Sequence, residues 1–169
     1  MTSDSDLVFF IEDVRPPPYQ PYHMITNMLA VGDYTSSYES FDVIFNFNYP
    51  QNGATFGNIH TMIEHHSRSE KIIYTIGLLD TTVYTTQLLY LFMQLGPYLA
   101  KSKGKRILFH CYAGVSRSST AAMMYLMMTT CLPMETIFNM VRSKRPMINP
   151  NPAFRHILSI CNHKREIIS

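Results

Sequence analysis

The sequence carries little charge for its length, and the two signs nearly cancel. Its 169 residues include 14 Lys and Arg and 12 Asp and Glu, which gives a formal net charge of +2. A chain with only 15% charged residues does not have the composition of a disordered segment. A net charge so close to zero also gives no electrostatic reason to expect binding to nucleic acid or to an anionic membrane.

Long apolar runs are also missing. A run such as Leu7–Ile11 is far shorter than the ~20 residues that a membrane-spanning helix requires, so we expect no membrane span. The N-terminal residues do not resemble a secretory signal, and Met1-Thr2-Ser3 lacks the glycine of a myristoylation site. From these absences we expect a protein of the cytoplasm, the nucleus or both.

Cysteine is scarce as well. Cys111, Cys131 and Cys161 are odd in number and far apart, which argues against a disulfide framework and for reduced thiols. No two of them have the close spacing of a zinc-binding pair. We therefore expect no structural metal.

What the chain does contain is enough apolar material for one core. Hydrophobic residues make up 46% of it, which suits a single domain of this length. The stretch "RPPPYQPY", residues Arg15–Tyr22, is incompatible with a helix or a central strand. We expect residues 1–22 to form a flexible or extended segment and residues 23–169 to form the domain. A chain-stiffening role for the prolines is favoured over partner docking.

After residue 22, strand-like and helix-like segments alternate. Strands are expected in "MLAVG", "FDVIFNF", the beginning of "KIIYTIGLLD" and "RILFH", and helices over 85–100, 117–130, 133–144 and from Asn151-Pro152 onward. This alternation is typical of an α/β domain. We expect a central, mostly parallel, twisted sheet flanked by helices.

The stretch "HCYAGVSRSST", residues 110–120, joins the last expected strand to a helix. A loop that enters a helix N-terminus presents free backbone N–H groups and the positive end of the helix dipole, which together bind anions. Gly114 permits a tight turn, and the planar guanidinium of Arg117 matches two oxygens of a phosphate. The pattern therefore predicts a phosphate-binding loop rather than a buried structural cysteine.

The same positive field favours the thiolate form of Cys111. A thiolate at the base of a phosphate site can attack phosphorus and form a cysteinyl-phosphate intermediate. The hydroxyl of Ser118, just after Arg117, is placed to donate to the sulfur when it leaves.

The motif resembles a known family. "HCYAGVSRS" matches the H-C-x-x-G-x-x-R-[ST] signature of cysteine-dependent protein tyrosine phosphatases, in the form typical of the small dual-specificity branch. "NMLAVGD" is similar to the family's opening strand pair, "VIFN" to its next strand, and "VRSKRPMINPNPAF" to its R-P-x-I-x-P-N block. The resemblance implies that phosphate is bound by Arg117 and by the loop residues Tyr112, Ala113, Gly114, Val115 and Ser116.

The family also uses an aspartic acid as general acid, and Asp80 lies 31 residues before Cys111. Independently, the leaving oxygen needs a proton, so one carboxylic acid must reach the site. Asp33, Asp42 and Glu64 are less well placed. The alternative for Asp80 is an acidic residue that only stabilises the N-terminus of the following helix.

Three further residues are expected to support the site. Asn151 matches a family asparagine near the loop, and its role could be confined to capping the last helix. Arg145 matches a basic position that can face substrate phosphate, although a solvated arginine at a helix end is an equal alternative. His110 is expected to hydrogen-bond to the loop backbone.

These features predict a phosphatase that removes phosphate from tyrosine and from serine or threonine in proteins, without metal or cofactor. One alternative is a phosphatase for a phosphoinositide or an RNA 5′ phosphate, but such substrates favour lysines in the loop, and residues 112–116 include none. Another alternative is a non-catalytic phospho-binding domain, which the presence of Cys111, Arg117 and Asp80 disfavours. The expected partner is a phosphoprotein, and the oligomeric state is left open.

Overall fold

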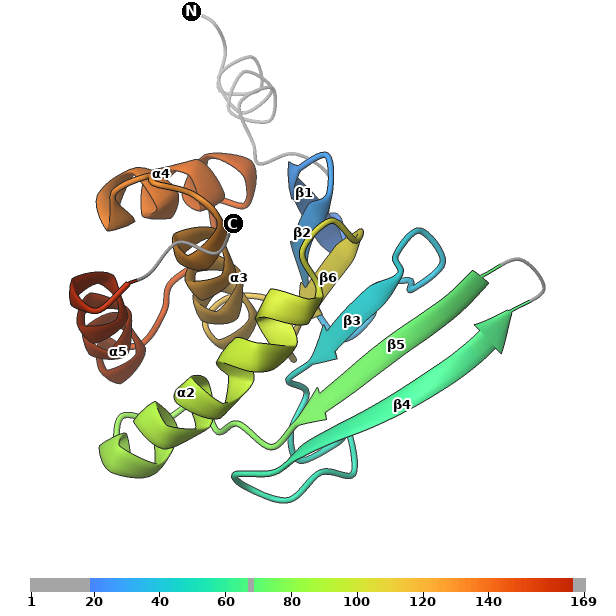
Figure 1. The fold of residues 1–169 in the computed structure, drawn as a ribbon, viewed down its shortest axis with the longest axis horizontal. Coiled ribbons are helices and arrows are strands. Elements are labelled where there is room, and N and C mark those ends of the chain that lie inside the picture. The colour runs from blue at the N-terminus through green and yellow to red at the C-terminus, as the bar shows by residue number, and fades with distance from the viewer. Residues whose placement is uncertain (1–18, 67–68, 166–169) are drawn as a thin grey trace, which may run out of the picture.

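The computed structural model describes residues 19–66 and 69–165. These residues form six strands and four helices (Figure 1). The strands are β1 (Tyr22–Thr26), β2 (Leu29–Gly32), β3 (Val43–Asn46), β4 (Ile59–His66), β5 (Ser69–Ile76) and β6 (Ile107–His110). The helices are α2 (Thr85–Lys101), α3 (Arg117–Thr129), α4 (Met134–Lys144) and α5 (Pro152–His163).

The strands form one mixed sheet in the order β1-β2-β6-β3-β5-β4. The four inner strands β2, β6, β3 and β5 are parallel to one another, whereas the edge strands β1 and β4 pair antiparallel with β2 and β5. This confirms the α/β fold with a mostly parallel sheet. The strand that precedes Cys111, β6, lies between β2 and β3 inside the sheet.

The two faces of the sheet pack against hydrophobic clusters of different size. On one face, residues such as Val31, Phe45 and Phe109 belong to the main core with the helices, and the rings of Phe45 and Phe109 stack at 4.9 Å. On the other face, Ile44 and Leu108 belong to a smaller cluster around Phe41. Because side chains alternate along a strand, this arrangement fixes the register of the sheet. Figure 1 shows the helices gathered on one side of the strands.

The resemblance implies a pair of strands near "NMLAVGD", but no sequence pattern places β1 at Tyr22–Thr26 or β4 at Ile59–His66. Strand β4 has no alternation of apolar and polar residues, and its neighbouring residues Met62 and Ile63 are both exposed. Strand β1 begins at Tyr22, inside the segment that we assigned to the extended lead-in. The Tyr19 hydroxyl also donates to the carboxylate of Asp33, which ties the end of that segment to the domain. The division at residues 22 and 23 stays a prediction, and residues 1–18 lie outside the described part.

The four expected helices are confirmed within a few residues. Helix α3 is buried along nearly its whole length, including Met123 and Met127, so its methionines serve the core. Helix α5 has Pro152 in its first turn, and Asn151 caps it because its side chain accepts from the N–H of Phe154 at 2.9 Å. Within the described residues, no helix is long and apolar enough to cross a membrane.

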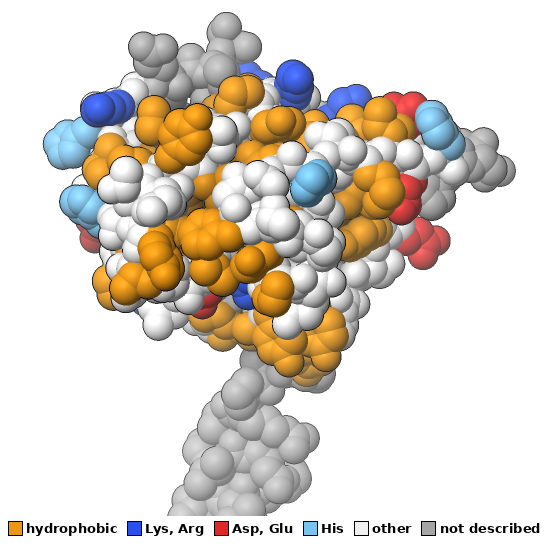
Figure 2. Space-filling view, turned by 90° about the horizontal axis from the view of Figure 1, so that it is seen from below, with side chains coloured by type: hydrophobic (Ala, Val, Ile, Leu, Met, Phe, Trp, Pro, Cys, Tyr) orange, Lys and Arg blue, Asp and Glu red, His pale blue; other side chains and the backbone are white. Residues whose placement is uncertain are grey.

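The carboxyl end of the parallel strands is the end where a ligand is expected to bind. Strands β3 and β5 point toward the lower end of Figure 1, which is the carboxyl end of the parallel strands and the side where α/β proteins bind ligands. Figure 2 views the molecule from below, and hydrophobic side chains are spread widely over this face while Lys and Arg appear mainly near its margin. Any ligand of this end therefore meets a surface of low charge.

Candidate active site

Cys111 lies directly after β6, at the base of the loop that leads into α3. The side chain is buried, with 2% of the residue exposed. Its sulfur accepts a hydrogen bond from the N–H of Gly114 at 3.2 Å, and it lies 3.2 Å from the Ser118 hydroxyl. The structure thus brings together Cys111, the middle of the loop and the first turn of α3, as the sequence predicted.

The loop turns its carbonyl oxygens outward, where each finds a donor elsewhere in the protein. The C=O of Tyr112 accepts from Tyr34 N, and those of Ala113 and Gly114 accept from Nη2 and Nε of Arg145. The C=O of Val115 accepts from Asn149 N and Ser119 Oγ. The C=O of Ser116 accepts from Thr120 N and from the hydroxyls of Ser119 and Thr120. In a trans peptide the C=O and the next N–H point in opposite directions. The N–H groups of the loop therefore point inward, toward the space above the Cys111 sulfur.

The N-terminus of α3 adds to this positive surface. Its N-cap, Ser116, makes no capping hydrogen bond with its side chain, and its first turn contains no acidic residue. The free N–H groups and the helix dipole are thus not neutralised within the helix. Loop and helix together form an anion-binding cradle, which we define as the backbone of residues 112–116 with Cys111 and Arg117.

Gly114 is required for both its conformation and its size. Its φ of +67° lies in the left-handed region, which residues with a side chain rarely adopt. A Cβ at this position would lie 2.6 Å from Arg145 Nη2 and 2.7 Å from the carbonyl oxygen of Gly32. The backbone of β2 therefore packs too closely against the loop for any larger residue.

Arg117 connects the cradle to the loops that surround it. Its Nη1 donates to the carbonyl oxygens of Phe47, Tyr49 and Leu78 at 2.8 Å, 3.0 Å and 3.2 Å. Its Nε is buried and has no hydrogen-bond partner among the described residues. A buried unpaired donor on a cation is costly, and an anion in the cradle would remove that cost. The side chain is therefore held in place by one nitrogen while another stays available to a ligand.

Arg145 supports the site as expected, but neither by facing the phosphate nor as a solvated side chain. Only 1% of the residue is exposed, so it is not a solvated arginine at a helix end. Its Nε donates to Gly114 O at 2.9 Å and its Nη2 to Ala113 O at 3.4 Å, so the side chain contacts the outward carbonyl side of the loop rather than its interior. Arg145 is a support of the loop from behind.

The remaining nitrogen of Arg145 reaches the start of the described chain. Nη1 lies 2.8 Å from Nδ1 of His23 and 3.4 Å from the carbonyl oxygen of Gln20. Burial lowers the pKa of His23, and the positive charge of Arg145 lowers it further, so His23 is neutral and its Nδ1 accepts the hydrogen bond. Burial also lowers the pKa of Arg145, while the negative charges of Asp33 and Cys111 oppose that shift.

Asp80 is exposed in the loop after β5, and Asn151 connects it to the cradle. The Asn151 side chain donates to Asp80 Oδ1 at 2.8 Å and to Thr81 O at 3.1 Å, and its backbone N–H donates to Ser116 Oγ at 3.0 Å. Asn151 thus does more than cap α5. Asp80, Asn151 and Ser116 also line a common cavity of about 590 Å³ beside the loop.

His110 is buried, but it does not bond to the loop backbone as expected. Its Nε2 lies 2.6 Å from the hydroxyl of Tyr38, and its Nδ1 has no hydrogen-bond partner within residues 19–66 and 69–165. Burial lowers the pKa of His110 to about 4, against a smaller opposing effect of the Asp33 carboxylate. The imidazole, on the last residue of β6, is therefore neutral at pH 7 and packs against the ring of Tyr38.

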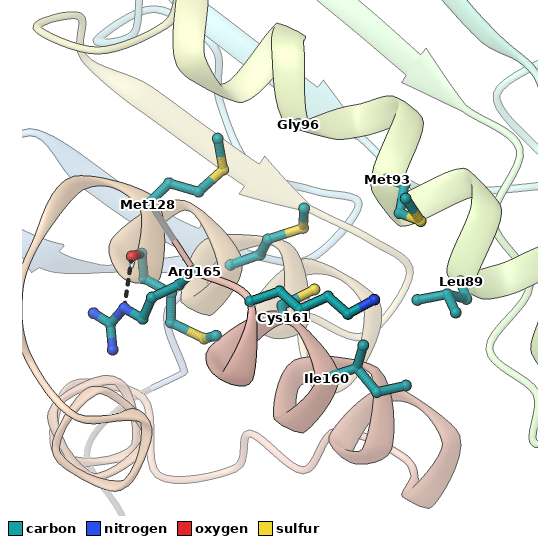
Figure 3. A pocket seen from close by; sticks show the side chains of 10 residues that line it. Leu89, Met93, Gly96, Met128, Ile160, Cys161 and Arg165 are labelled. Carbon is teal, nitrogen blue, oxygen red and sulfur yellow. Dashed lines mark hydrogen bonds between the residues drawn. The ribbon is translucent and has the colours of Figure 1, made fainter. Parts of the chain in front are cut away.

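The other two cysteines are remote from this chemistry. Cys131 is exposed. Cys161 lines an apolar pocket of about 300 Å³ with methionines and aliphatic residues of α2, α3 and α5 (Figure 3). Burial raises the pKa of the Cys161 thiol, which lowers its reactivity. None of the residues that line this pocket belongs to the cradle. Among the described residues, no cluster of His, Cys, Asp and Glu is placed to hold a metal.

Comparisons with known proteins agree with this geometry. Residues 35–164 match the family described as "Dual specificity phosphatase, catalytic domain". A segment of 55 residues is 42% identical to dual specificity protein phosphatase 15 of Rattus norvegicus, and it covers 32% of this chain and 23% of that protein. A segment of 53 residues is 45% identical to "MAP kinase phosphatase with leucine-rich repeats protein 3" of Dictyostelium discoideum, and it covers 31% of this chain and 6% of that protein. The chain thus spans less than a quarter of the length of these relatives.

Solved structures share the fold. The human tyrosine phosphatase-like serine/threonine/tyrosine-interacting protein aligns with a TM-score of 0.66 at 21% identity, over 85% of this chain and 96% of that one. Human DUSP28 also aligns with a TM-score of 0.66, at 20% identity, over 89% of this chain and 98% of that one. At such identities the likeness concerns the fold alone.

Replacing Arg145 with Lys should destabilise the protein by about 3 kcal/mol, because one ammonium cannot serve the separate acceptors of a buried guanidinium. The midpoint of urea unfolding measures the loss. Lys144→Met, at the exposed neighbouring position on α4, is the matched control and should change stability little. Equal stability of Arg145→Lys and the wild type would contradict a supporting role for Arg145.

Acidification from pH 7 to pH 5 should lower the unfolding free energy of the wild type by about 2 kcal/mol because of His110. The pKa of this side chain is 6.5 in the unfolded chain and about 4 in the folded protein. At a pH between these two pKa values, His110 binds a proton in the unfolded chain but not in the folded protein, so stability falls as the pH falls. His110→Gln should lose correspondingly less between the two pH values in urea unfolding. His65→Gln, whose parent side chain is 78% exposed, should keep the wild-type difference. An unchanged difference in His110→Gln would refute the assignment.

Proposed function

Because this chain belongs to the family of dual-specificity phosphatase catalytic domains, we propose that it hydrolyses phosphotyrosine and phosphoserine or phosphothreonine in proteins. The observation that carries the proposal is the cradle itself. A buried cysteine sulfur lies at its base, inward-pointing N–H groups surround it, and the buried Nε of Arg117 has no partner in the described part of the chain. This arrangement suits a tetrahedral dianion bound directly above the sulfur.

In the first step, the thiolate of Cys111 attacks phosphorus opposite the ester oxygen. The S–P bond forms and the P–O bond of the ester breaks, while Asp80 donates a proton to the leaving oxygen. Asn151 donates to Oδ1 of Asp80, which leaves Oδ2 to carry that proton. The equatorial oxygens receive hydrogen bonds from the loop N–H groups and from Arg117, which stabilise the transition state.

In the second step, water attacks the cysteinyl phosphate. Asp80, now a carboxylate, accepts a proton from that water, and the S–P bond breaks to release inorganic phosphate. The Ser118 hydroxyl lies 3.2 Å from the sulfur, close enough to donate a hydrogen bond to the departing thiolate. The side chains present thus provide nucleophile, acid and charge stabilisation, and the mechanism requires no metal or cofactor.

A protein substrate is supported over a polyanionic one. Residues 112–116 carry no lysine or arginine, and the supporting cation Arg145 is buried on the far side of the loop. A phosphoinositide or an RNA 5′ end brings several negative charges, and the lower face of the molecule has few exposed cations to meet them (Figure 2). A phosphorylated side chain on a protein brings one dianion.

We place the protein in the cytoplasm or nucleus, since Cys111, Cys131 and Cys161 are all free thiols.

Cys111→Ser should abolish hydrolysis of p-nitrophenyl phosphate, because an alcohol in this position is a far weaker nucleophile than a thiolate. Release of p-nitrophenol measures activity, and urea unfolding checks that the variant remains folded. Cys131→Ser, at an exposed cysteine away from the cradle, is the control and should retain wild-type rates. Turnover by a purified Cys111→Ser variant at wild-type rates would exclude the covalent mechanism.

Asp80→Asn should lower kcat most for substrates whose leaving group needs a proton. The loss should reach about 100-fold or more for a phosphothreonine peptide and be smaller for aryl phosphates with acidic phenols. The basic limb of the pH–rate profile should also flatten, since that limb reports loss of the acid's proton. Steady-state kinetics over a series of phenols provides the comparison. A uniform loss across leaving groups, with the basic limb intact, would assign the proton to another carboxylate.

A further inference from the structure

The first residue of the cradle, Tyr112, forms a stacked pair with Tyr34. The two ring centroids lie 5.0 Å apart and the planes differ by only 9°. Each residue is nevertheless 54% exposed, so the pair covers only one face of each ring. Stacked tyrosines that expose half their surface at a catalytic loop are not needed for the core and are available to a ligand.

Tyr112 is the neighbour of the nucleophile in the chain, and its half-exposed ring belongs to the surface beside the cradle. Tyr112 directly follows Cys111, and its carbonyl oxygen points outward to accept from Tyr34 N at 3.2 Å. At the opposite end of the loop, Ser116 is connected through Asn151 to Asp80. The tyrosine pair and the general acid Asp80 are thus attached to opposite ends of the loop that would bind phosphate.

Tyr34 is held rigidly, so the pair is preformed. The preceding residue, Asp33, is buried; its N–H donates to Pro21 O at 2.8 Å and its carboxylate accepts from Thr35 N at 2.8 Å. Burial alone would raise the pKa of Asp33, but hydrogen bonds from Thr35 and Tyr19 outweigh it and hold the pKa below its usual value. The charged anchor fixes the backbone at Tyr34, and a ring fixed in advance loses little entropy when it binds a ligand.

Aryl and alkyl phosphates differ in what they offer to this exposed tyrosine pair. Resting on the proposed function, we propose that Tyr112, positioned by Tyr34, contacts the phenyl ring of phosphotyrosine and gives the enzyme a preference for phosphotyrosine over phosphoserine and phosphothreonine. A phenyl ring gains an aromatic contact with Tyr112, whereas the short alkyl side chains offer no ring. The pair is neutral, so it does not recognise additional negative charge.

The test compares two peptides of identical sequence, one with phosphotyrosine and one with phosphothreonine. The readout is the ratio of their kcat/KM values, in which general damage to the loop cancels. Tyr112→Ala should lower the ratio by roughly fivefold to tenfold, the size of one aromatic contact, and Tyr112→Phe should retain it. Tyr34→Ala should lower the ratio less, and Tyr34→Phe should preserve it. Tyr90→Ala removes a tyrosine on α2 that is 64% exposed, and should leave the ratio unchanged.

Binding of non-hydrolysable ligands separates this proposal from the proposed function. Calorimetry with phenylphosphonate and methylphosphonate measures ring recognition even if neither peptide is hydrolysed. Tyr112→Ala should weaken phenylphosphonate roughly fivefold and methylphosphonate much less. Equal losses for both ligands, or no loss for either, would overturn the role of Tyr112. Tighter binding of adenosine 5′-phosphate than of phenylphosphonate, lost in Tyr112→Ala, would also overturn it, because the ring recognised would then be a nucleobase.

Discussion

Peptide N–H groups can surround an anion only if the loop that carries them turns its carbonyl oxygens the other way, and those oxygens then need donors of their own. In this protein the donors come from four separate places. They are the backbone after β2, the end of α4, the segment before α5 and the first turns of α3. The cradle is therefore local in sequence but depends on the whole domain for its shape.

The local part of this arrangement could be read from the sequence. A short apolar strand, a loop with glycine and an apolar helix are adjacent in the chain, and their order predicts that Cys111 lies below free N–H groups. The resemblance to a family contributed Asp80 and Asn151. The outer donors are different, since Tyr34 and Asn149 donate through backbone N–H groups. Any non-proline residue has such a group, so side-chain identity carries no signal of this role.

The errors have a common origin at the edges of the sheet. Edge strands meet solvent on one side, and neither β1 nor β4 shows the alternation that reveals a half-buried strand. Missing β1 then concealed the burial of Arg145, because His23 of β1 is one of its partners. A helix-end arginine is ordinarily solvated, and only a strand more than a hundred residues earlier removes this one from water. The prediction for His110 failed similarly, since its partner Tyr38 is distant in sequence.

The burial of Arg145 also bears on how the cradle forms during folding. Its hydrogen bonds to Gln20 and His23 close sequence separations of 125 and 122 residues. Contacts of such separation enclose most of the 169 residues in one loop, and the entropic cost of closing that loop makes them slow to form. Helices and local turns can assemble before that closure, whereas the cradle acquires its final support only with it. Because this support joins Arg145, which follows α4, to His23 of β1, it cannot form in a chain still emerging from the ribosome before α4 is complete.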